Sequence, residues 1–205
     1  MTVLQRLIRS NDAASAAEFA IVLPILLLFL FGIIDGGRFL WEFNHAEKAT
    51  QMGVRYAVVT DPVLSGLSSY SFSTSASDLI SAGTAVPTAN FTSAACTSAT
   101  CTCTSSTGGF CGTTSLDSDA FNNIVTRMAL IYPTIKASNV EVDYKNVGLG
   151  FAGNPDGPDV SPLVTVKLKN LTFHPITCLV FACSISMPSF SSALTLEDAA
   201  GSVSN

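Results

Sequence analysis

Hydrophobic and polar positions form three successive patterns along the chain, and the first is a nearly continuous apolar run. The run over residues 13–34 is interrupted at only four positions, Ser15, Glu18, Pro24 and Gly32. About 20 apolar residues cross the ~30 Å hydrocarbon core of a bilayer. The run therefore predicts a transmembrane helix over residues 14–36.

The second pattern has the period of an amphipathic helix and begins where the apolar run ends. Its apolar face comprises Phe39, Phe43, Ala46, Ala49, Met52 or Gly53, and Tyr56. Asp61 and Pro62 are typical of a helix end, so we expect an extension over residues 37–60. The whole helix would have about 45 residues and a length of roughly 70 Å. A break at Gly36-Gly37, giving a separate juxtamembrane helix, is the alternative.

Residues 62–115 are rich in Ser and Thr and lack periodicity, which predicts long loops. A short helix should follow, with Asp117 or Ser118 as its N-cap and Pro133 at its end. Its apolar face consists of Phe121, Ile124, Val125, Met128 and Tyr132.

The third pattern is strict alternation, which predicts strands over residues 140–145 and 164–169. A further strand pair around 184–187 and 193–197 would complete the sheet. One apolar face on each strand is typical of an antiparallel sheet covered on one side, here by the amphipathic half of the long helix. The predicted fold class is α+β, with one exported domain over residues 61–205.

Charge and composition support a membrane-anchored protein. Only 12% of the 205 residues are charged, against about 25% in soluble domains, and the net charge is −5. This acidic balance argues against a nucleic-acid partner, which requires clustered Lys and Arg. Arg6 and Arg9 precede the apolar run, so the N-terminus should lie in the cytoplasm and the C-terminal domain should be exported. A cleaved secretory signal is the alternative, but no A-x-A pattern follows the run.

All six cysteines lie in the part expected to be exported: Cys96, Cys101, Cys103, Cys111, Cys178 and Cys183. An even number of cysteines in an oxidising compartment predicts disulfides, with fifteen possible connectivities. Cys178 and Cys183 are expected to pair with each other. The first four could instead bind a metal, but their spacing matches no common zinc module, so no metal site is predicted.

Catalytic chemistry has little support in the sequence. His45 and His174 belong to no nucleophile–base arrangement, and no cofactor-binding motif is present. Asp156 and Asp159 could contribute to a calcium loop, although turn formation alone explains them. Glu18 is the exception among the polar residues, because a carboxylate within an apolar helix is either functional or drawn to the headgroups.

Two segments of the long helix resemble the TadE-like family, whose members are pseudopilins or minor pilins of the tight-adherence (Flp) pilus. The first runs from Ala-Ala-Ser-Ala-Ala-Glu18-Phe19 to Pro24 and, after Phe31-Gly32-Ile33-Ile34-Asp35, to Arg38. The second is the segment 49–57, Ala-Thr-Gln-Met-Gly-Val-Arg-Tyr-Ala. The resemblance covers about residues 11–60 and implies a pilin-like fold in which a single-pass helix packs on an antiparallel sheet.

The resemblance also implies partners and a processing site. A prepilin peptidase would cut between Ala13 and Ala14, removing a cytoplasmic leader 1–13 and making Glu18 the fifth residue. The family usually has Gly at the position of Ala13, and a glutamate and an aromatic where Asp35 and Gly36 stand. Glu18, Phe19 and Pro24 would then set the register of assembly with other pilins, in a filament or homo-oligomer.

The sequence thus predicts a structural, non-enzymatic pilus subunit in the inner membrane, and after processing at the cell surface. The competing hypothesis is a signal-anchored extracytoplasmic binding or adhesion module. An anchored hydrolase is a third, and it would need a pocket joining His45 or His174 to acidic residues.

Overall fold

The computed structural model describes residues 11–178 and 183–201, with side chains from residue 15 onward. The chain divides into two compact units. One unit comprises residues 1–42 and 172–186, and the other comprises residues 43–171 and 187–205. Each unit is described by itself.

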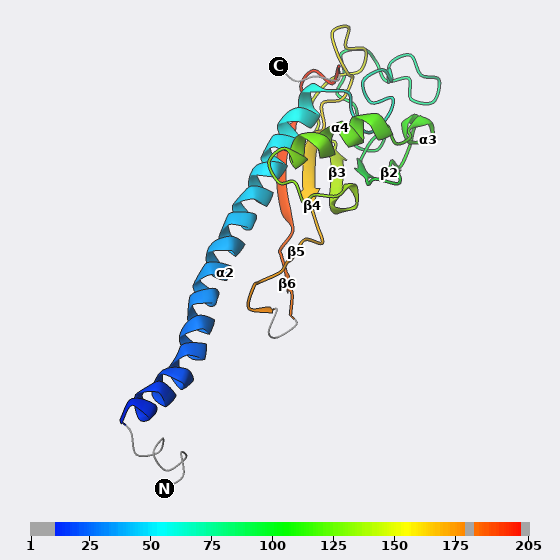
Figure 1. The fold of residues 1–205 in the computed structure, drawn as a ribbon. Helices are drawn as coiled ribbons and strands as arrows, with labels where there is room; N and C mark the ends of the chain where they lie inside the picture. Colours follow the sequence, from blue (N-terminus) through cyan, green and yellow to red (C-terminus); the bar gives the residue numbers. More distant parts are fainter. Residues whose placement is uncertain (1–10, 179–182, 202–205) are drawn as a thin grey trace. The chain divides into compact units, whose positions relative to one another are not determined.

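One long helix, α2 (Asn11–Val59), contributes to both units (Figure 1). It contains Pro24 and runs without a break through Gly36 and Gly37, so the alternative of a separate juxtamembrane helix is wrong. Its end at Val59 agrees with the expected end near residue 60. There the Thr60 hydroxyl donates to the carbonyl of Tyr56 at 2.8 Å.

The second unit is built on a five-stranded antiparallel sheet in the order β2-β1-β3-β4-β7. The strands are β1 (Ser93–Cys96), β2 (Cys101–Thr104), β3 (Val140–Lys145), β4 (Leu163–Leu168) and β7 (Phe190–Thr195). β3 and β4 confirm the two alternating segments, and Val142 pairs with Val166 at the middle of their ladder.

The alternation places one face of the sheet in the core. Val142, Tyr144 and Val166 are fully buried on that face. The second half of α2 contributes mainly small residues to the same core, namely Ala46, Ala49, Gly53, Val54, Ala57 and Val58. A Cβ added at Gly53 would lie 2.7 Å from Met128 Sδ and 3.2 Å from Val166 Cγ1. Gly53 therefore allows α2 to approach both the sheet and the helix that carries Met128.

That helix is α4 (Ser118–Ala129), and its first turn is capped as expected. The Asp117 carboxylate accepts hydrogen bonds from the backbone N–H groups of Asp119 and Ala120. The helix ends at Ala129, before the expected end at Pro133, and a turn carries the chain through Tyr132. A 3-10 helix, Ala137–Asn139, then leads into β3.

Two expectations about the sheet are wrong. The region 62–115 is not all loop, because it supplies β1, β2 and a one-turn helix α3 (Phe110–Thr113). The segment near 184–187 does not join the main sheet: β6 (Ile185–Ser186) pairs instead with β5 (Thr172–Phe173) in a two-stranded sheet of the first unit. Only the segment near 193–197 adds a strand, β7, which pairs with β4.

The long loops are ordered around buried aromatic rings and one carboxylate. Phe72, Phe91 and Phe110 are fully buried, and the Phe110 ring contacts both of the others, tilted against Phe72 and edge-on to Phe91. Asp78 accepts hydrogen bonds from the Tyr70 hydroxyl and, at 2.7 Å, from Asn90 Nδ2. A loop with its own aromatic core needs no regular secondary structure to be ordered.

Candidate functional site

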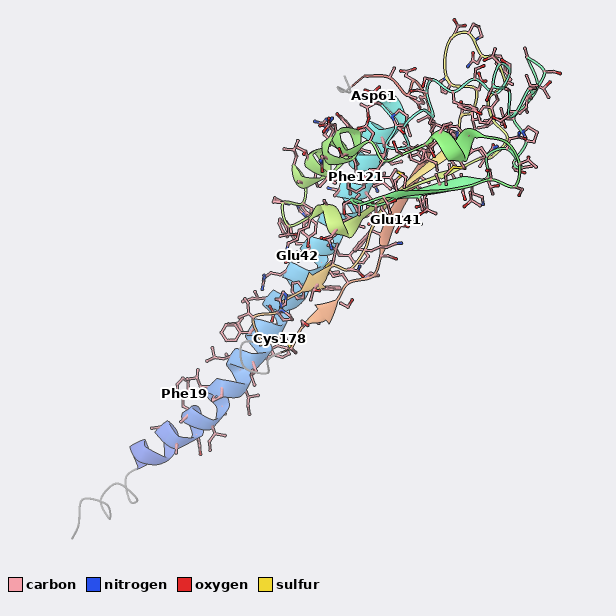
Figure 2. All side chains as sticks on the ribbon, turned by 90° about the vertical axis from the view of Figure 1, so that its right-hand side faces the viewer. Phe19, Glu42, Asp61, Phe121, Glu141 and Cys178 are labelled. Atoms are coloured by element: carbon pink, nitrogen blue, oxygen red, sulfur yellow. A yellow bond between two sulfur atoms is a disulfide. The ribbon has the colours of Figure 1, made fainter. Side chains whose placement is uncertain are left out.

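The first half of α2 exposes an unusually large apolar surface. Its most apolar 18 residues have a mean hydropathy of 2.6, and none of them is buried. Phe19 is 64% exposed, and its side chain is labelled on this segment in Figure 2. Exposed apolar patches of this extent mark a membrane or protein contact. Among the described residues this is the one helix long and apolar enough to cross a membrane.

The residues expected to guide processing and assembly lie along this same segment. Glu18 is exposed, and Pro24 stands inside the helix without ending it. Ala13 and Ala14 lie within the bounds of α2, but their side chains are outside the described part. The roles of these residues stay predictions.

A buried carboxylate lies where the apolar run ends. Asp35 is only 6% exposed, and both of its oxygens are hydrogen-bonded. Oδ1 accepts from Ile176 N at 2.7 Å, and Oδ2 accepts from Thr177 N at 2.8 Å and Thr177 Oγ1 at 2.9 Å. Arg38 lies one turn further along α2, and its Nη1 is 3.4 Å from Oδ1 of Asp35. A carboxylate with this many donors can remain charged although it is buried.

The partners of Asp35 belong to a short segment that we call the arm, defined by residues 172–178 and 183–186. The arm contains the β5–β6 pair and the disulfide between Cys178 and Cys183. Phe173 of the arm packs edge-on against Phe39 of α2, with ring centroids 5.4 Å apart. The Arg38 guanidinium lies over the Phe173 ring, 5.4 Å from its centroid. Asp35, Arg38 and Phe39 thus fasten the arm to one side of the helix.

The disulfide pattern is local. Cys178–Cys183 forms as expected, and the other two bonds join Cys96 to Cys101 and Cys103 to Cys111. Cys96 and Cys101 are also paired directly across the β1–β2 ladder. Because all four of the clustered cysteines are in disulfides, they are not available as thiolate metal ligands.

The solvent-facing side of the main sheet carries a cross-strand ladder of charges. Lys167 on β4 forms ion pairs with both Glu141 and Asp143 on β3. Nζ of Lys169 lies 2.6 Å from Oε2 of Glu141. The hydrogen bond from Lys169 holds the pKa of Glu141 below its usual range, against the opposing effect of burial. The hydrogen bond to Asp143 raises the pKa of Lys167. These cross-strand ion pairs stabilise the pairing of β3 with β4, although Oδ1 of Asp143 is buried without a hydrogen-bond partner.

The residues considered for catalysis and calcium have other surroundings. His45 lies on α2, and His174 follows β5 and is exposed. Asp159 is buried, and it accepts hydrogen bonds from Phe72 N at 2.7 Å and from Asn154 N at 3.0 Å. Asp156 is exposed on the turn. Asp159 therefore fastens one loop to another, and the described residues contain no group of three or more possible metal ligands.

The comparisons with known proteins bear on the helix alone. A family model described as TadE-like protein matches residues 13–55. The helix α2 is therefore a TadE-like segment. No curated protein and no solved structure matches the chain.

The TadE-like match confirms the resemblance that the sequence indicated and covers most of α2. It begins at Ala13 and includes Glu18, Phe19, Pro24 and Asp35. A TadE-like segment indicates a pilin-like protein associated with the Tad pilus. Residues 56–205 lie beyond the match, so the description of their sheet and loops rests on the structure alone.

Asp35 is the residue that the sequence did not identify as a site. It entered only as a departure from the family's usual glutamate. Its signal was its place directly after the last apolar residue of the run, where a charged side chain needs a partner. Its partner Thr177 lies 142 positions further along the chain, and no sequence pattern connects the two residues.

Proposed function

We propose that this chain is a minor pilin or pseudopilin that takes part in the assembly of a Tad (Flp) pilus through α2. Its role is structural rather than catalytic. The observation that carries the proposal is the coincidence of the TadE-like match with a helix whose apolar segment is wholly exposed. A surface of this kind needs either lipid or other helices around it.

Before processing, the helix anchors the chain in the inner membrane, with residues 14–36 in the bilayer and the C-terminal domain exported. Processing between Ala13 and Ala14 then frees an α-ammonium group at the N-terminus of the helix. The Glu18 carboxylate lies about one turn along α2 from that amine. It pairs with the amine of the same or a neighbouring subunit.

Such a pair sets the register of neighbouring helices. An unpaired charge in a medium of low dielectric constant costs several kcal/mol, so misaligned helices are disfavoured. The partners are other pilins or pseudopilins, the prepilin peptidase and the membrane.

The test of this proposal is processing. Coexpression of the full chain with the prepilin peptidase of its own host should remove 13 residues and leave Ala14 at the N-terminus, as read by N-terminal sequencing. Ala13→Gly restores the family's usual residue and should be cut at least as efficiently. An inactive peptidase is the matched control. If the peptidase leaves both chains uncut, the proposal is wrong and a signal-anchored binding or adhesion module becomes the better description.

The register role has its own test. Glu18→Ala should still insert into the membrane, because removal of a charge favours insertion, but it should not assemble. Glu18→Gln keeps the size of the side chain and should fail in the same way. Normal pilus number for either variant, counted by electron microscopy, would contradict the register role.

A further inference from the structure

The arm (172–178 and 183–186) is the feature that assembly through α2 does not explain. Asp35 directly follows the apolar run, and the arm is hydrogen-bonded to it through Ile176 and Thr177. In a helix that spans the bilayer, this attachment brings the arm to the outer end of the span. The inference thus rests on the anchoring step of the proposed function.

The composition of this segment suits a lipid surface. The sequence from 172 to 186 contains no Asp, Glu, Lys or Arg, in a chain with 25 such residues among its 205. Ile185 on β6 is 46% exposed. Charged side chains make the entry of a segment into the interface costly, whereas an uncharged segment with exposed apolar groups enters readily.

The backbone hydrogen bonds of the arm also suit a position at the membrane interface. Irregular backbone near the hydrocarbon region is tolerated only where its polar groups find partners within the protein. Asp35 supplies acceptors for two consecutive N–H groups, those of Ile176 and Thr177, and also for the Thr177 hydroxyl. In return these donors satisfy a carboxylate that would otherwise be costly at this depth.

The neighbouring side chains of α2 are of the types found at a membrane interface. Trp41 is 57% exposed, and tryptophan is enriched at the headgroup level. Arg38 packs its guanidinium over Phe173 and remains partly exposed, at 42% of its side-chain surface. An arginine in this position can reach the headgroups while its stem lies on apolar surface.

We propose that the arm is a second membrane contact of this protein, one that rests among the lipid headgroups of the exported leaflet and is held there by Asp35. The partner is a lipid bilayer. The arm thereby fixes the depth of α2, since a helix that slides inward or outward must carry the arm with it.

Depth-dependent quenching of tryptophan fluorescence tests this directly. Trp41 is the chain's only tryptophan, so the full chain with Trp41→Phe provides a silent background. Ile185→Trp reports on the arm, and Phe29→Trp reports on the span. Each double variant is reconstituted in phosphatidylcholine vesicles with bromine atoms either high on the acyl chains or near their ends.

Shallow bromines should quench the indole of the I185W variant about twofold more than deep bromines do, because the headgroup region lies nearer to them. The F29W variant should be quenched by both. Adding Asp35→Ala to I185W should lower the shallow quenching about twofold, since the arm loses its acceptor.

The failures are distinguishable. An I185W indole that neither lipid quenches, beside a quenched F29W, overturns the inference and leaves the anchoring step intact. The same conclusion follows if the indole of the I185W variant is quenched neither by the water-soluble ion iodide nor by brominated lipid, because the arm then contacts protein. If F29W also escapes quenching, the helix does not span, and both the inference and the anchoring step are wrong. Unchanged quenching in the Asp35→Ala variant overturns the role of Asp35.

Discussion

Asp35 and Thr177 are 142 positions apart in the sequence and are joined by two hydrogen bonds. Oδ2 of Asp35 accepts from the Thr177 backbone N–H at 2.8 Å and from its hydroxyl at 2.9 Å. With Ile176 N on Oδ1 at 2.7 Å, three donors of the arm meet one carboxylate. Removing the charge therefore has consequences that can be followed at individual amides.

Asp35→Ala should raise the hydrogen-exchange rates of the Ile176 and Thr177 amides about 10- to 100-fold. A hydrogen bond to a charged group contributes about 1.5–3 kcal/mol, and 1.4 kcal/mol corresponds to a factor of ten. Exchange of the full chain in detergent, read by mass spectrometry, measures this. Thr177→Val removes only the hydroxyl bond and should have a smaller effect. Equal exchange in wild type and Asp35→Ala would show that the carboxylate does not hold the arm.

Asp78→Asn should reduce the pH dependence of stability. Burial alone would raise the pKa of Asp78, but hydrogen bonds from Tyr70, Asn90 and Gly109 outweigh it and hold the pKa below its usual range. A carboxyl group whose pKa is lowered by folding stabilises the folded state at any pH above its pKa in the unfolded chain, about 3.9. This contribution is lost as the pH falls through the lower pKa of the folded state.

Urea unfolding from pH 7 down to pH 3 measures the effect. Wild type should be more stable than Asp78→Asn at pH 7, and the difference should shrink below about pH 4. Asp156→Asn is the control, since this carboxyl group is exposed on a turn. A constant difference over the whole range would mean that the charge of Asp78 is not what stabilises the loops.

Gly53→Leu should destabilise the second unit by about 1–3 kcal/mol, because extra atoms in a packed core force side chains from their rotamers. The first added atom already lies 2.8 Å from Met128 Cγ. Gly37→Ala on the same helix meets nothing within 4 Å, and it should be neutral or stabilising by up to about 1 kcal/mol. Thermal unfolding in detergent compares the two, and a neutral Gly53→Leu would mean that α2 does not pack closely there.

Tyr144→Phe should cost about 1–3 kcal/mol, since it leaves a buried donor without its acceptor. The Tyr144 hydroxyl accepts from Val63 N at 2.9 Å, and the tyrosine side chain is fully buried. Burial also raises the pKa of Tyr144, so its phenol stays protonated in alkaline solution. Equilibrium unfolding gives the cost, and Tyr56→Phe, at a partly exposed position, is the comparison.

The parts of the fold predicted from the sequence are those with strong periodicity. The apolar run and its helical extension indicated α2. The alternation at 140–145 and 164–169 indicated β3 and β4, the second shifted by one residue from its observed bounds. The strand β1 was not predicted because Ser-Ala-Ala-Cys has no β-branched apolar residue. The strand β2 was not predicted because Cys-Thr-Cys-Thr resembles the sequence of the loops around it. Both are strands because they pair with β3 and with each other, which is long-range information.

The candidate site divides in the same way. Glu18 stood out as a carboxylate within the apolar run, and the resemblance added Phe19 and Pro24. All three share one stretch of helix with the apolar surface. Asp35 could not be understood from its neighbours in sequence, because its donors come from a segment far along the chain. The Cys178–Cys183 pair was predicted because no other cysteine is near it in sequence. The other four cysteines lie close together, and their pairing depends on the β1–β2 register, which sets Cys96 opposite Cys101, and on the position of α3, which carries Cys111.

The position of β7 has a consequence for the order in which the main sheet can be completed. β7 follows every other strand of the main sheet in sequence, yet it pairs along β4, and just beyond it Glu197 N donates to the carbonyl of Val58 at 3.0 Å. During synthesis, which runs from the N-terminus to the C-terminus, the edge of β4 therefore stays unpaired until β7 has been made. An unpaired edge invites pairing with another chain, so a chain truncated before β7 should aggregate through β4.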